Sequence, residues 1–310
     1  TLRMVAWEVT RSCNLACVHC RASALRGPYE GELETARCMR VLDEIATVGK
    51  PVIILTGGEP LLRPDICEIA AYGDRKGFRM VLATNGTLVD QGVAGDLIRS
   101  GIRRVSISID GPDAESHDLF RGVTGAFAGA MAGIEAMKRS GLEFQINTTI
   151  TATNLARVRE IHELVHRIGA AAHHIFLLVP TGRGKDLADQ SISALAYEET
   201  LNWFYEEGLG CAIQLKATCA PQYHRISRQR GERGAVPGAR AEARTVVTHS
   251  MDTDRPSLHA MTRGCLGGSA FCFISHRGQV QPCGYLELDC GRLSEKGFSE
   301  IWNESDIFLD

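Results

Sequence analysis

Three cysteines stand close together near the start of the chain, at Cys13, Cys17 and Cys20, with the spacing C-x3-C-x2-C. Thiolates this close on one loop can hold three corners of a cubic iron–sulfur cluster, which leaves the fourth iron open to an outside ligand. A zinc knuckle is the alternative, and it would need His19 or a remote residue as its fourth ligand. Ordinary buried thiols are the third interpretation, because free cysteine packs as a small apolar residue.

A second group of cysteines lies near the other end of the chain, at Cys265, Cys272, Cys283 and Cys290. Residues 271–285 have the pattern of a β-hairpin with a glycine at its turn. Such a hairpin would bring Cys272 and Cys283 together. Two groups of close cysteines indicate metal binding rather than disulfides, and a four-cysteine zinc site would have the same spacing.

The composition limits the class of protein. The chain has 310 residues, 44% of them apolar, 11 cysteines and a formal net charge of −3. This charge gives no basic face for nucleic acid, and the sequence has no run of about 18 apolar residues that could span a membrane. Residues 1–11 lack the long apolar stretch of a signal peptide. The odd number of cysteines and the length of the chain favour a cytoplasmic location over a secreted disulfide protein.

The middle of the chain alternates short apolar runs with amphipathic stretches, which is the pattern of βα units around a parallel sheet. The expected strands are residues 4–10, 52–56, 80–84, 105–110, 144–150 and 175–179. The expected helices are residues 34–48, 66–76, 92–100, 127–140 and 156–168. These units predict an α/β fold with an open, partial (β/α)6 barrel, whose chemistry would lie at the carboxyl ends of the strands. The first three cysteines directly follow the first strand.

The chain divides into a barrel part and a small cysteine-rich part. We expect the barrel, followed by a helix at residues 193–207 and a strand at residues 212–217, to occupy residues 1–230. Residues 231–257, rich in Arg, Gly and Ala, predict a flexible connection. Residues 258–310 would form a small C-terminal domain that contains the hairpin and a short final helix.

Polar residues follow several of the expected strands. A Gly-Gly-Glu sequence at residues 57–59 ends the second strand, where glycines let the backbone approach a ligand and the carboxylate can accept from an ammonium group. Thr84 and Asn85 end the third strand, and the alternation of the fourth strand puts Ser108 and Asp110 on one face. Each motif alone is common in turns and half-exposed strands. Their succession at neighbouring strand ends indicates one binding site.

Together these residues resemble the signature of the radical S-adenosylmethionine (SAM) superfamily, in which C-x3-C-x2-C follows the first barrel strand. The resemblance implies that Cys13, Cys17 and Cys20 ligate a [4Fe-4S] cluster whose open iron binds the amino and carboxylate groups of SAM. It also implies that His19 lies near the adenine and Glu59 at the methionine amino group. The further SAM contacts that it implies are Gly57, Gly58, Thr84, Asn85, Ser108, Asp110, Arg121 (on the SAM carboxylate), Asn147 and Leu178.

The C-terminal segment resembles the small twitch or SPASM domain that follows the barrel in many radical SAM enzymes. By that resemblance Cys265, Cys272 and Cys283 ligate one auxiliary [4Fe-4S] cluster, with Cys290 or Cys219 as the fourth ligand. The sequence lacks the further cysteines that a third cluster would need. The expected cofactors are therefore two [4Fe-4S] clusters and SAM.

Three segments, residues 20–24, 178–185 and 264–276, are most similar to the SAM-dependent haem synthases of the sirohaem-based haem pathway. This resemblance implies oxidative decarboxylation of two propionates of iron-coproporphyrin III to vinyl groups, which gives protohaem. A 5′-deoxyadenosyl radical would take a hydrogen atom from a propionate, and the auxiliary cluster is suited to accept the surplus electron. An external low-potential donor, such as flavodoxin or ferredoxin, would supply the first electron.

A tetra-anionic porphyrin needs cationic anchors. The expected anchors are Arg21, Arg183, Lys185 and Arg225, and the candidates for contact with the iron or a propionate are His173, His174, His224 and His276. Three alternatives stay open: a sister didecarboxysirohaem deacetylase, for which tyrosine is expected at the position of Arg21, a peptide-modifying SPASM maturase, and a zinc-binding module without catalysis.

Overall fold

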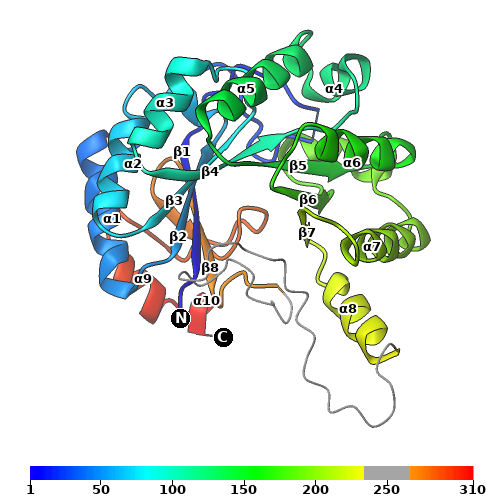
Figure 1. Ribbon diagram of the computed structural model, residues 1–310. Coiled ribbons are helices and arrows are strands. Elements are labelled where there is room, and N and C mark those ends of the chain that lie inside the picture. Colours follow the sequence, from blue (N-terminus) through cyan, green and yellow to red (C-terminus); the bar gives the residue numbers. More distant parts are fainter. Residues whose placement is uncertain (234–264, 310) are drawn as a thin grey trace.

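The computed structural model describes residues 1–233 and 265–309. The strands of these residues form one sheet in the order β10-β9-β8-β1-β2-β3-β4-β5-β6-β7 (Figure 1). The strands are β1 (Met4–Thr10), β2 (Val52–Gly57), β3 (Arg79–Thr84), β4 (Ile102–Ser108), β5 (Phe144–Ile150), β6 (Ala172–Leu177), β7 (Gln214–Thr218), β8 (Phe271–Ile274), β9 (Gln279–Gln281) and β10 (Gly291–Arg292). All neighbours from β8 through β1 to β7 pair in parallel.

Helices cover the outer face of the sheet (Figure 1). The α-helices are α1 (Thr35–Val48), α2 (Ile66–Arg75), α3 (Gln91–Arg99), α4 (Ala114–Arg121), α5 (Ala126–Ser140), α6 (Val158–Arg167), α7 (Ala194–Gly208), α8 (Gln222–Arg233), α9 (Phe298–Glu304) and α10 (Asp306–Leu309). The 3-10 helices are η1 (Pro60–Leu62), η2 (Leu155–Arg157) and η3 (Gly182–Gln190). Helical chain follows each strand from β1 to β6, so the predicted partial (β/α)6 barrel is confirmed. Within the described ranges, none of the helices combines the length and the hydropathy needed to cross a lipid bilayer.

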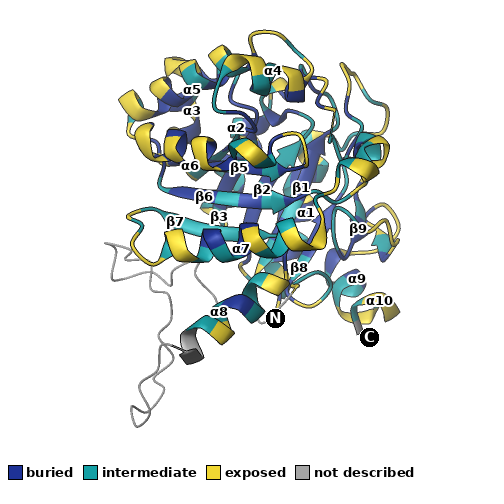
Figure 2. Cartoon of the chain, turned by 90° about the vertical axis from the view of Figure 1, so that its right-hand side faces the viewer, coloured by how far each residue is buried: buried dark blue, intermediate teal, exposed yellow. Residues whose placement is uncertain are grey.

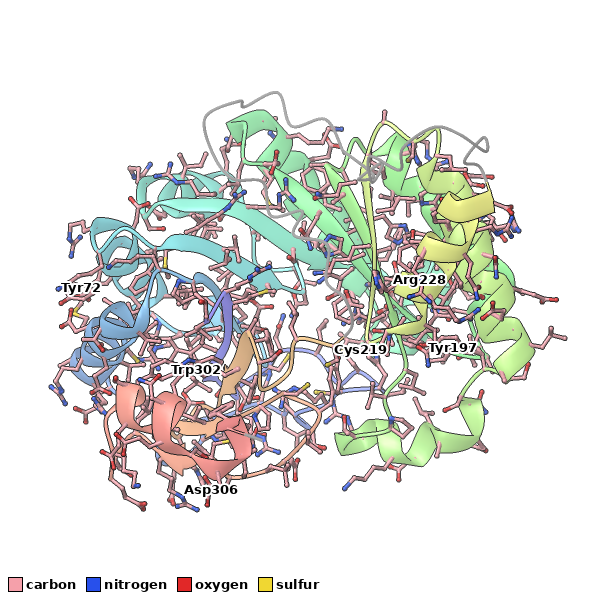
Figure 3. The ribbon with its side chains drawn as sticks, turned by 90° about the horizontal axis from the view of Figure 1, so that it is seen from below. Tyr72, Tyr197, Cys219, Arg228, Trp302 and Asp306 are labelled. Carbon is pink, nitrogen blue, oxygen red and sulfur yellow. The ribbon has the colours of Figure 1, made fainter. Side chains whose placement is uncertain are left out.

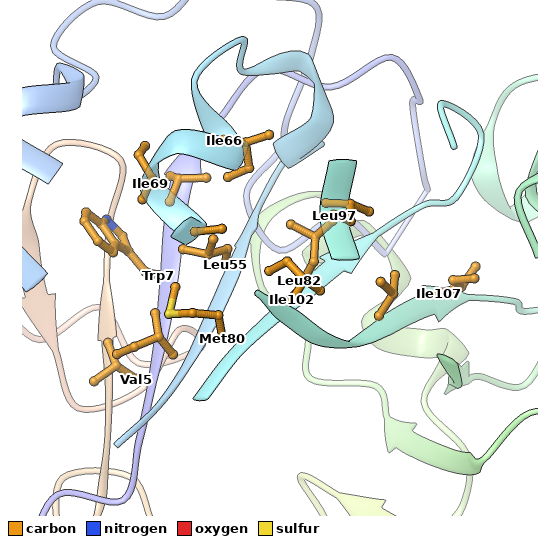
Figure 4. Packing of buried hydrophobic residues seen from close by; sticks show 14 of the residues in the cluster. Val5, Trp7, Leu55, Ile66, Ile69, Met80, Leu82, Leu97, Ile102 and Ile107 are labelled. Carbon is orange, nitrogen blue, oxygen red and sulfur yellow. The ribbon is translucent and has the colours of Figure 1, made fainter. Parts of the chain in front are cut away.

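The two faces of the sheet differ in polarity. Toward the helices, side chains such as Trp7, Leu55 and Leu82 are fully buried and form an apolar core (Figure 4). The opposite, inner face alternates with them along each strand and carries partly exposed polar side chains, among them Ser106 and Ser108. Figure 2 shows the contrast between the buried strands and the exposed outer sides of the helices. The inner face is therefore the side of the sheet that suits a polar ligand.

The C-terminal hairpin continues the barrel sheet. β8 pairs in parallel with β1, with Met4 opposite Phe271, and β9 returns antiparallel to β8. Gly278 has a φ of 78° in the turn between them, a left-handed value that favours glycine. The helix α9 docks on α1, where the Phe298 N–H donates to a Glu44 carboxylate oxygen at 2.9 Å. The predicted hairpin is confirmed, and it lies beside the strand that leads into the first three cysteines.

Three α-helices lie outside the elements expected from the sequence: α4, α8 and α10. The helix α4 begins after Asp113, whose carboxylate accepts from the Ser116 N–H at 3.0 Å, and it ends at Gly122, which has a φ of 69°. The helix α8 extends through residues 231–233, where the flexible connection was expected to begin. The rest of that expected connection, residues 234–257, lies outside the described residues.

The apolar core predicts a measurable cost for one truncation. Leu82 on β3 is 0% exposed, so Leu82→Ala should lower the free energy of unfolding by about 2–5 kcal/mol, because it removes buried methyl groups and leaves a cavity. Leu119→Ala, at a side chain that is 76% exposed, is the control and should change this free energy by less than about 0.5 kcal/mol. Urea unfolding followed by circular dichroism measures both, and equal effects would contradict this assignment of the core.

Candidate active site

The first thiol group consists of Cys13, Cys17 and Cys20, on the loop after β1. This loop has no regular secondary structure. The Val18 N–H donates to the Phe120 carbonyl at 3.1 Å, which ties the loop to the end of α4. Gly122 permits a close approach here, because a Cβ atom at this position would lie 2.5 Å from the Ala16 carbonyl oxygen. The neighbouring helix therefore sets the path of the loop.

Arg183 in η3 holds the same loop from another side. Its Nε and Nη1 atoms donate to the carbonyl oxygens of Cys17 and Ala24 at 2.9 and 2.8 Å. Gly182 allows this approach, since a Cβ atom there would lie 2.2 Å from the Arg21 carbonyl oxygen. The structure thus gives Arg183 a role in holding the loop, and its expected role as a substrate anchor stays a prediction.

Backbone N–H groups point at the sulfur atoms of the first thiol group. The Leu15 N–H lies 3.4 Å from Cys13 Sγ, and the Ala24 N–H lies 3.3 Å from Cys20 Sγ. Such hydrogen bonds tune cluster-bound thiolate sulfur. Burial, with the nearby thiols, raises the pKa of Cys13 to about 11, and a bound cationic centre would stabilise its thiolate form. Three thiols on one loop, two of them with backbone N–H donors, fit a cluster that keeps one iron open.

Glu59 is a buried carboxylate at the end of β2. Its Oε1 accepts from Thr84 Oγ1 at 2.7 Å and its Oε2 accepts from the Asn85 N–H at 2.8 Å. The side chain is 0% exposed, and burial raises its pKa. Among the residues that the structure describes, no cationic side chain pairs with it. A buried carboxylate is costly without a counter-charge, so Glu59 fits the ammonium group of a ligand.

The two glycines before Glu59 serve backbone packing. A Cβ atom at Gly57 would lie 2.2 Å from the Thr10 carbonyl oxygen, and one at Gly58 would lie 2.4 Å from the Ser12 carbonyl oxygen. The Glu59 N–H donates to the same Ser12 oxygen at 2.7 Å. The close approach expected of these glycines is thus made to the chain that leaves β1, and it brings Glu59 next to the first thiol group.

Arg121 and Asp110 form a buried ion pair beside Cys17. Arg121 Nη1 also lies 3.6 Å from Cys17 Sγ, so this guanidinium, expected on the SAM carboxylate, contacts the chain itself. Its Nε is buried and has no hydrogen-bond partner. The same holds for Nδ1 of His19, whose ring packs on Phe120 at 4.6 Å between centroids. These two buried nitrogens without partners, Arg121 Nε and His19 Nδ1, could each hydrogen-bond to a polar ligand beside the first thiol group.

A row of polar side chains crosses the inner face from β4 to β7. In the sheet register Ser108 lies beside Asn147, Asn147 beside His174, and His174 beside Lys216. Gln145 Nε2 contacts both Asn147 Oδ1 and His174 Nδ1 at 3.0 Å. Lys216 was not among the residues expected from the sequence. Its signal is the alternation along β7, which puts it on the same face as this row.

The second thiol group consists of Cys219, Cys265 and Cys283. Gly267 lies between the last two, since a Cβ atom there would be 3.4 Å from Cys265 Sγ and 3.6 Å from Cys283 Cβ. Burial, together with these two thiols, raises the pKa of Cys219 to about 12. Cys219 has a φ of 57°, which is rare for a residue with a side chain, and it lies between the hairpin and α8 (Figure 3). The N–H groups of Gly267 and Tyr285 point at the sulfurs of Cys265 and Cys283, each at 3.4 Å.

Cys272 and Cys290 lie apart from the second thiol group. Cys272 pairs with Val5 in the sheet and faces the helices, where it is 0% exposed in the apolar core. Burial, and then the neighbouring Cys290, raises its pKa. This placement corrects the expectation that Cys272 joins Cys265 and Cys283, because successive side chains on a strand point to opposite faces. Of the two candidates for the fourth ligand, Cys219 lies with the group and Cys290 does not.

Arg21 connects the two thiol groups. It pairs with Glu8 on β1, and its Nη1 donates to the Gly284 carbonyl at 3.3 Å. Glu8 also contacts His276 Nδ1 at 2.6 Å. Burial raises the pKa of Glu8, but His276 and Arg21 outweigh burial and hold it below its usual value. Burial and nearby thiols of both groups raise the pKa of Tyr285, which follows Gly284 in the chain.

Four further residues expected near a substrate have other surroundings. Arg225 pairs with Glu198 on the surface of α7 and α8. His173 is fully buried on the helix-facing side of β6. Lys185 is exposed in η3, and His224 is half-buried on α8. Arg225 and His173 therefore do not reach the inner face, in contrast to the sequence-based expectation.

An open parallel barrel with one thiol group at its mouth, and a second beside a hairpin of the same sheet, defines a cluster-dependent enzyme. The chain belongs to the radical SAM superfamily, whose family model matches residues 7–168. The SPASM model, described as an iron–sulfur cluster-binding domain, matches residues 265–307. The superfamily and the cofactors expected from the sequence are confirmed: the enzyme uses a [4Fe-4S] cluster, SAM and a further iron–sulfur cluster.

Comparisons with known proteins agree with this placement. The "AdoMet-dependent heme synthase" of Nitratidesulfovibrio vulgaris is 54% identical over 99% of this chain and 80% of its own length. The "Fe-coproporphyrin III synthase" of Methanosarcina barkeri is 38% identical over 97% of this chain and 73% of its own length. Among solved structures, anSMEcpe with bound AdoMet has a TM-score of 0.68 at 18% identity, and the match covers 100% of this chain and 82% of that one. At 18% identity, the likeness to anSMEcpe shows that the two chains share a fold.

The position of the thiols predicts opposite outcomes for two cysteine substitutions. Cys219→Ala should lower the iron content after anaerobic reconstitution from about eight to about four atoms per chain, because two cubic clusters hold about eight. Cys272→Ala should keep about eight, since its side chain lies in the apolar core. Iron and sulfide analysis measures both variants. Full iron in Cys219→Ala together with a loss in Cys272→Ala would contradict this assignment.

Proposed function

We propose that the protein is a radical SAM haem synthase, which converts two propionates of iron-coproporphyrin III to vinyl groups and so gives protohaem. The observation that carries this proposal is the 54% identity, over 99% of the chain, to a relative named AdoMet-dependent heme synthase. The relative named Fe-coproporphyrin III synthase is more distant, at 38% identity. The reaction of a sister enzyme is therefore the weaker candidate.

We assign the first thiol group to the SAM cluster and the second thiol group to the auxiliary cluster. When bound, the clusters and SAM supply the one-electron chemistry that generates a carbon-centred radical. Glu59 would hold the methionine amino group of SAM, because its buried carboxylate has hydrogen-bond donors and no cationic partner among the described side chains. His19 would lie against the adenine, with its orphaned Nδ1 turned to the ligand.

The inner face offers cationic groups for the carboxylates of the porphyrin. Lys216 is half-buried, burial lowers its pKa, and no carboxylate of the described chain pairs with it. A substrate carboxylate beside it would stabilise the ammonium form. The Arg21 side chain is 25% exposed next to the hairpin and offers a second cationic group. Two cationic anchors, Lys216 on β7 and Arg21 on the loop after β1, would fix which propionate faces the radical, since orientation contributes much of the rate in such sites.

The proposed reaction also implies an electron donor and a division of roles within the chain. Each propionate loses one hydrogen atom, one carbon dioxide and one electron when it becomes a vinyl group. We infer that flavodoxin or ferredoxin, or a similar low-potential protein, supplies the electron that starts each turnover in the cytoplasm. We further propose that residues 1–230 act as the barrel unit and residues 258–310 as the auxiliary-cluster unit.

Anaerobic turnover with a defined porphyrin tests this function. The reconstituted protein, given SAM, a reductant and iron-coproporphyrin III, should yield protohaem, seen by mass spectrometry as the loss of two formic-acid equivalents, that is, two CO2 and two H2. Iron-coproporphyrin III recovered unchanged, alongside 5′-deoxyadenosine, would contradict the proposed substrate. Formation of iron-coproporphyrin III from didecarboxysirohaem would identify the sister reaction instead.

The assignment of Lys216 predicts a change in substrate binding. Lys216→Met removes the charge and keeps most of the apolar stem, so KM for the porphyrin should rise about tenfold or more, as expected for the loss of a charge-assisted hydrogen bond. Arg225→Ala, at a guanidinium paired with Glu198 on the surface, is the control and should leave KM unchanged. Steady-state kinetics measures both. An unchanged KM in Lys216→Met would remove this residue from the substrate site.

A further inference from the structure

A cluster of possible metal ligands lies outside the site described above. His162 and His166 stand one turn apart on α6, and Cys211 precedes β7. His166 Nε2 lies 3.2 Å from His162 Nε2 and 3.2 Å from Cys211 Sγ. All three ligand atoms lie within 4.8 Å of one another. None of these residues takes part in the cluster sites or the inner face.

We propose that His162, His166 and Cys211 form a third metal site, which binds one zinc ion. The ligand chemistry supports this choice, because imidazole nitrogen and thiolate sulfur are the donors that zinc prefers. In a tetrahedral zinc site, two nitrogens lie about 3.3 Å apart and a nitrogen and a sulfur about 3.6 Å apart, as follows from the usual bond lengths. The two distances from His166 Nε2, 3.2 Å to His162 Nε2 and 3.2 Å to Cys211 Sγ, are already close to these values. Little movement would therefore be needed to bind the ion.

A chain of hydrogen bonds orients the His162 ring. Thr148 Oγ1 donates to the Ile109 carbonyl at 2.7 Å, so its lone pair accepts from His173 Nε2 at 3.0 Å. His173 Nδ1 in turn lies 3.0 Å from His162 Nδ1, so this contact engages the Nδ1 atom of His162. The other ring nitrogen, His162 Nε2, lies 3.2 Å from His166 Nε2, and such outer hydrogen bonds are typical of metal-bound histidines.

The surroundings leave room for a fourth ligand. A pocket of about 560 Å³ opens at this place and is lined by His166, Glu206, Glu207, Gly210, Cys211 and Ala212. Glu207 Oε1 accepts from Trp203 Nε1 at 2.9 Å, and its other oxygen or a water molecule would complete four-coordination.

The position of the site suggests what the metal does. Cys211 lies before β7 and His166 near the end of α6, so the site sits at the amino ends of the strands, opposite the first thiol group. Within the described chain β7 is an edge strand that pairs only with β6, and Cys219 of the second thiol group directly follows it. A metal bound by α6 and by the segment before β7 would connect the two and so stabilise the edge strand β7.

Zinc binding to the holoprotein tests the proposal. With both iron–sulfur clusters assembled, the protein should bind one zinc ion, and zinc K-edge absorption should show nitrogen at about 2.0 Å and one sulfur at about 2.3 Å. His166→Ala and Cys211→Ser should each weaken zinc binding at least about tenfold in competition with a chelator. The exposed Glu163 lies on the same helix and Cys67 is a half-buried thiol on α2, so Glu163→Ala and Cys67→Ser are matched controls that should keep wild-type affinity.

Thermal unfolding tests whether bound zinc stabilises the sheet edge at β7. It should raise the thermal unfolding midpoint of the wild type and of both controls, but not that of His166→Ala or Cys211→Ser. Any one of three results would overturn the proposal. These are zinc coordinated by sulfur alone, wild-type zinc affinity in both His166→Ala and Cys211→Ser, and no zinc bound in competition with the chelator.

Discussion

The active site depends on how a loop without regular secondary structure is held at the carboxyl end of β1. Three thiols can leave one iron open only if their sulfurs keep fixed separations. This loop has no regular backbone hydrogen bonds of a helix or strand that could fix them. The restraint comes from its neighbours: the end of α4 through Phe120, and the guanidinium of Arg183, which binds two loop carbonyls. Gly122 and Gly182 let these elements approach without a Cβ clash. The cluster geometry is thus a product of tertiary packing.

Buried polar groups without protein partners form the second constraint. Glu59 is fully buried just after β2 and Lys216 is half-buried on β7, and neither has a counter-charge among the described side chains. Such groups cost stability in the free protein, and a zwitterionic cofactor and an anionic substrate would each relieve one of them. On β1 to β4 the helix-facing side chains, such as Val5, Ile53 and Met80, belong to the apolar core. The alternation of a β-strand therefore separates chemistry on one face from stability on the other.

The same alternation explains what the sequence could and could not predict. Apolar runs and amphipathic stretches are local signals, and they predicted the six βα units and the hairpin. The resemblance to the twitch or SPASM domain grouped Cys272 with Cys265 and Cys283, but the alternation of side chains along β8 turns Cys272 into the core. The role of Arg183 in holding the first loop could not be predicted, because its partners, the carbonyls of a loop far away in the chain, are set only by the fold. Lys216 was overlooked, although its face on β7 can be read from the strand pattern.

The open iron of the first thiol group is the central claim, and spectroscopy of bound SAM tests it most directly. The reduced protein should be mixed with SAM labelled with nitrogen-15 and oxygen-17 in its methionine part and studied by electron–nuclear double resonance. The account predicts hyperfine coupling from both labels to the cluster, and its loss in Cys17→Ala but not in Cys272→Ala. Absence of both couplings in the wild-type protein with bound SAM would contradict it.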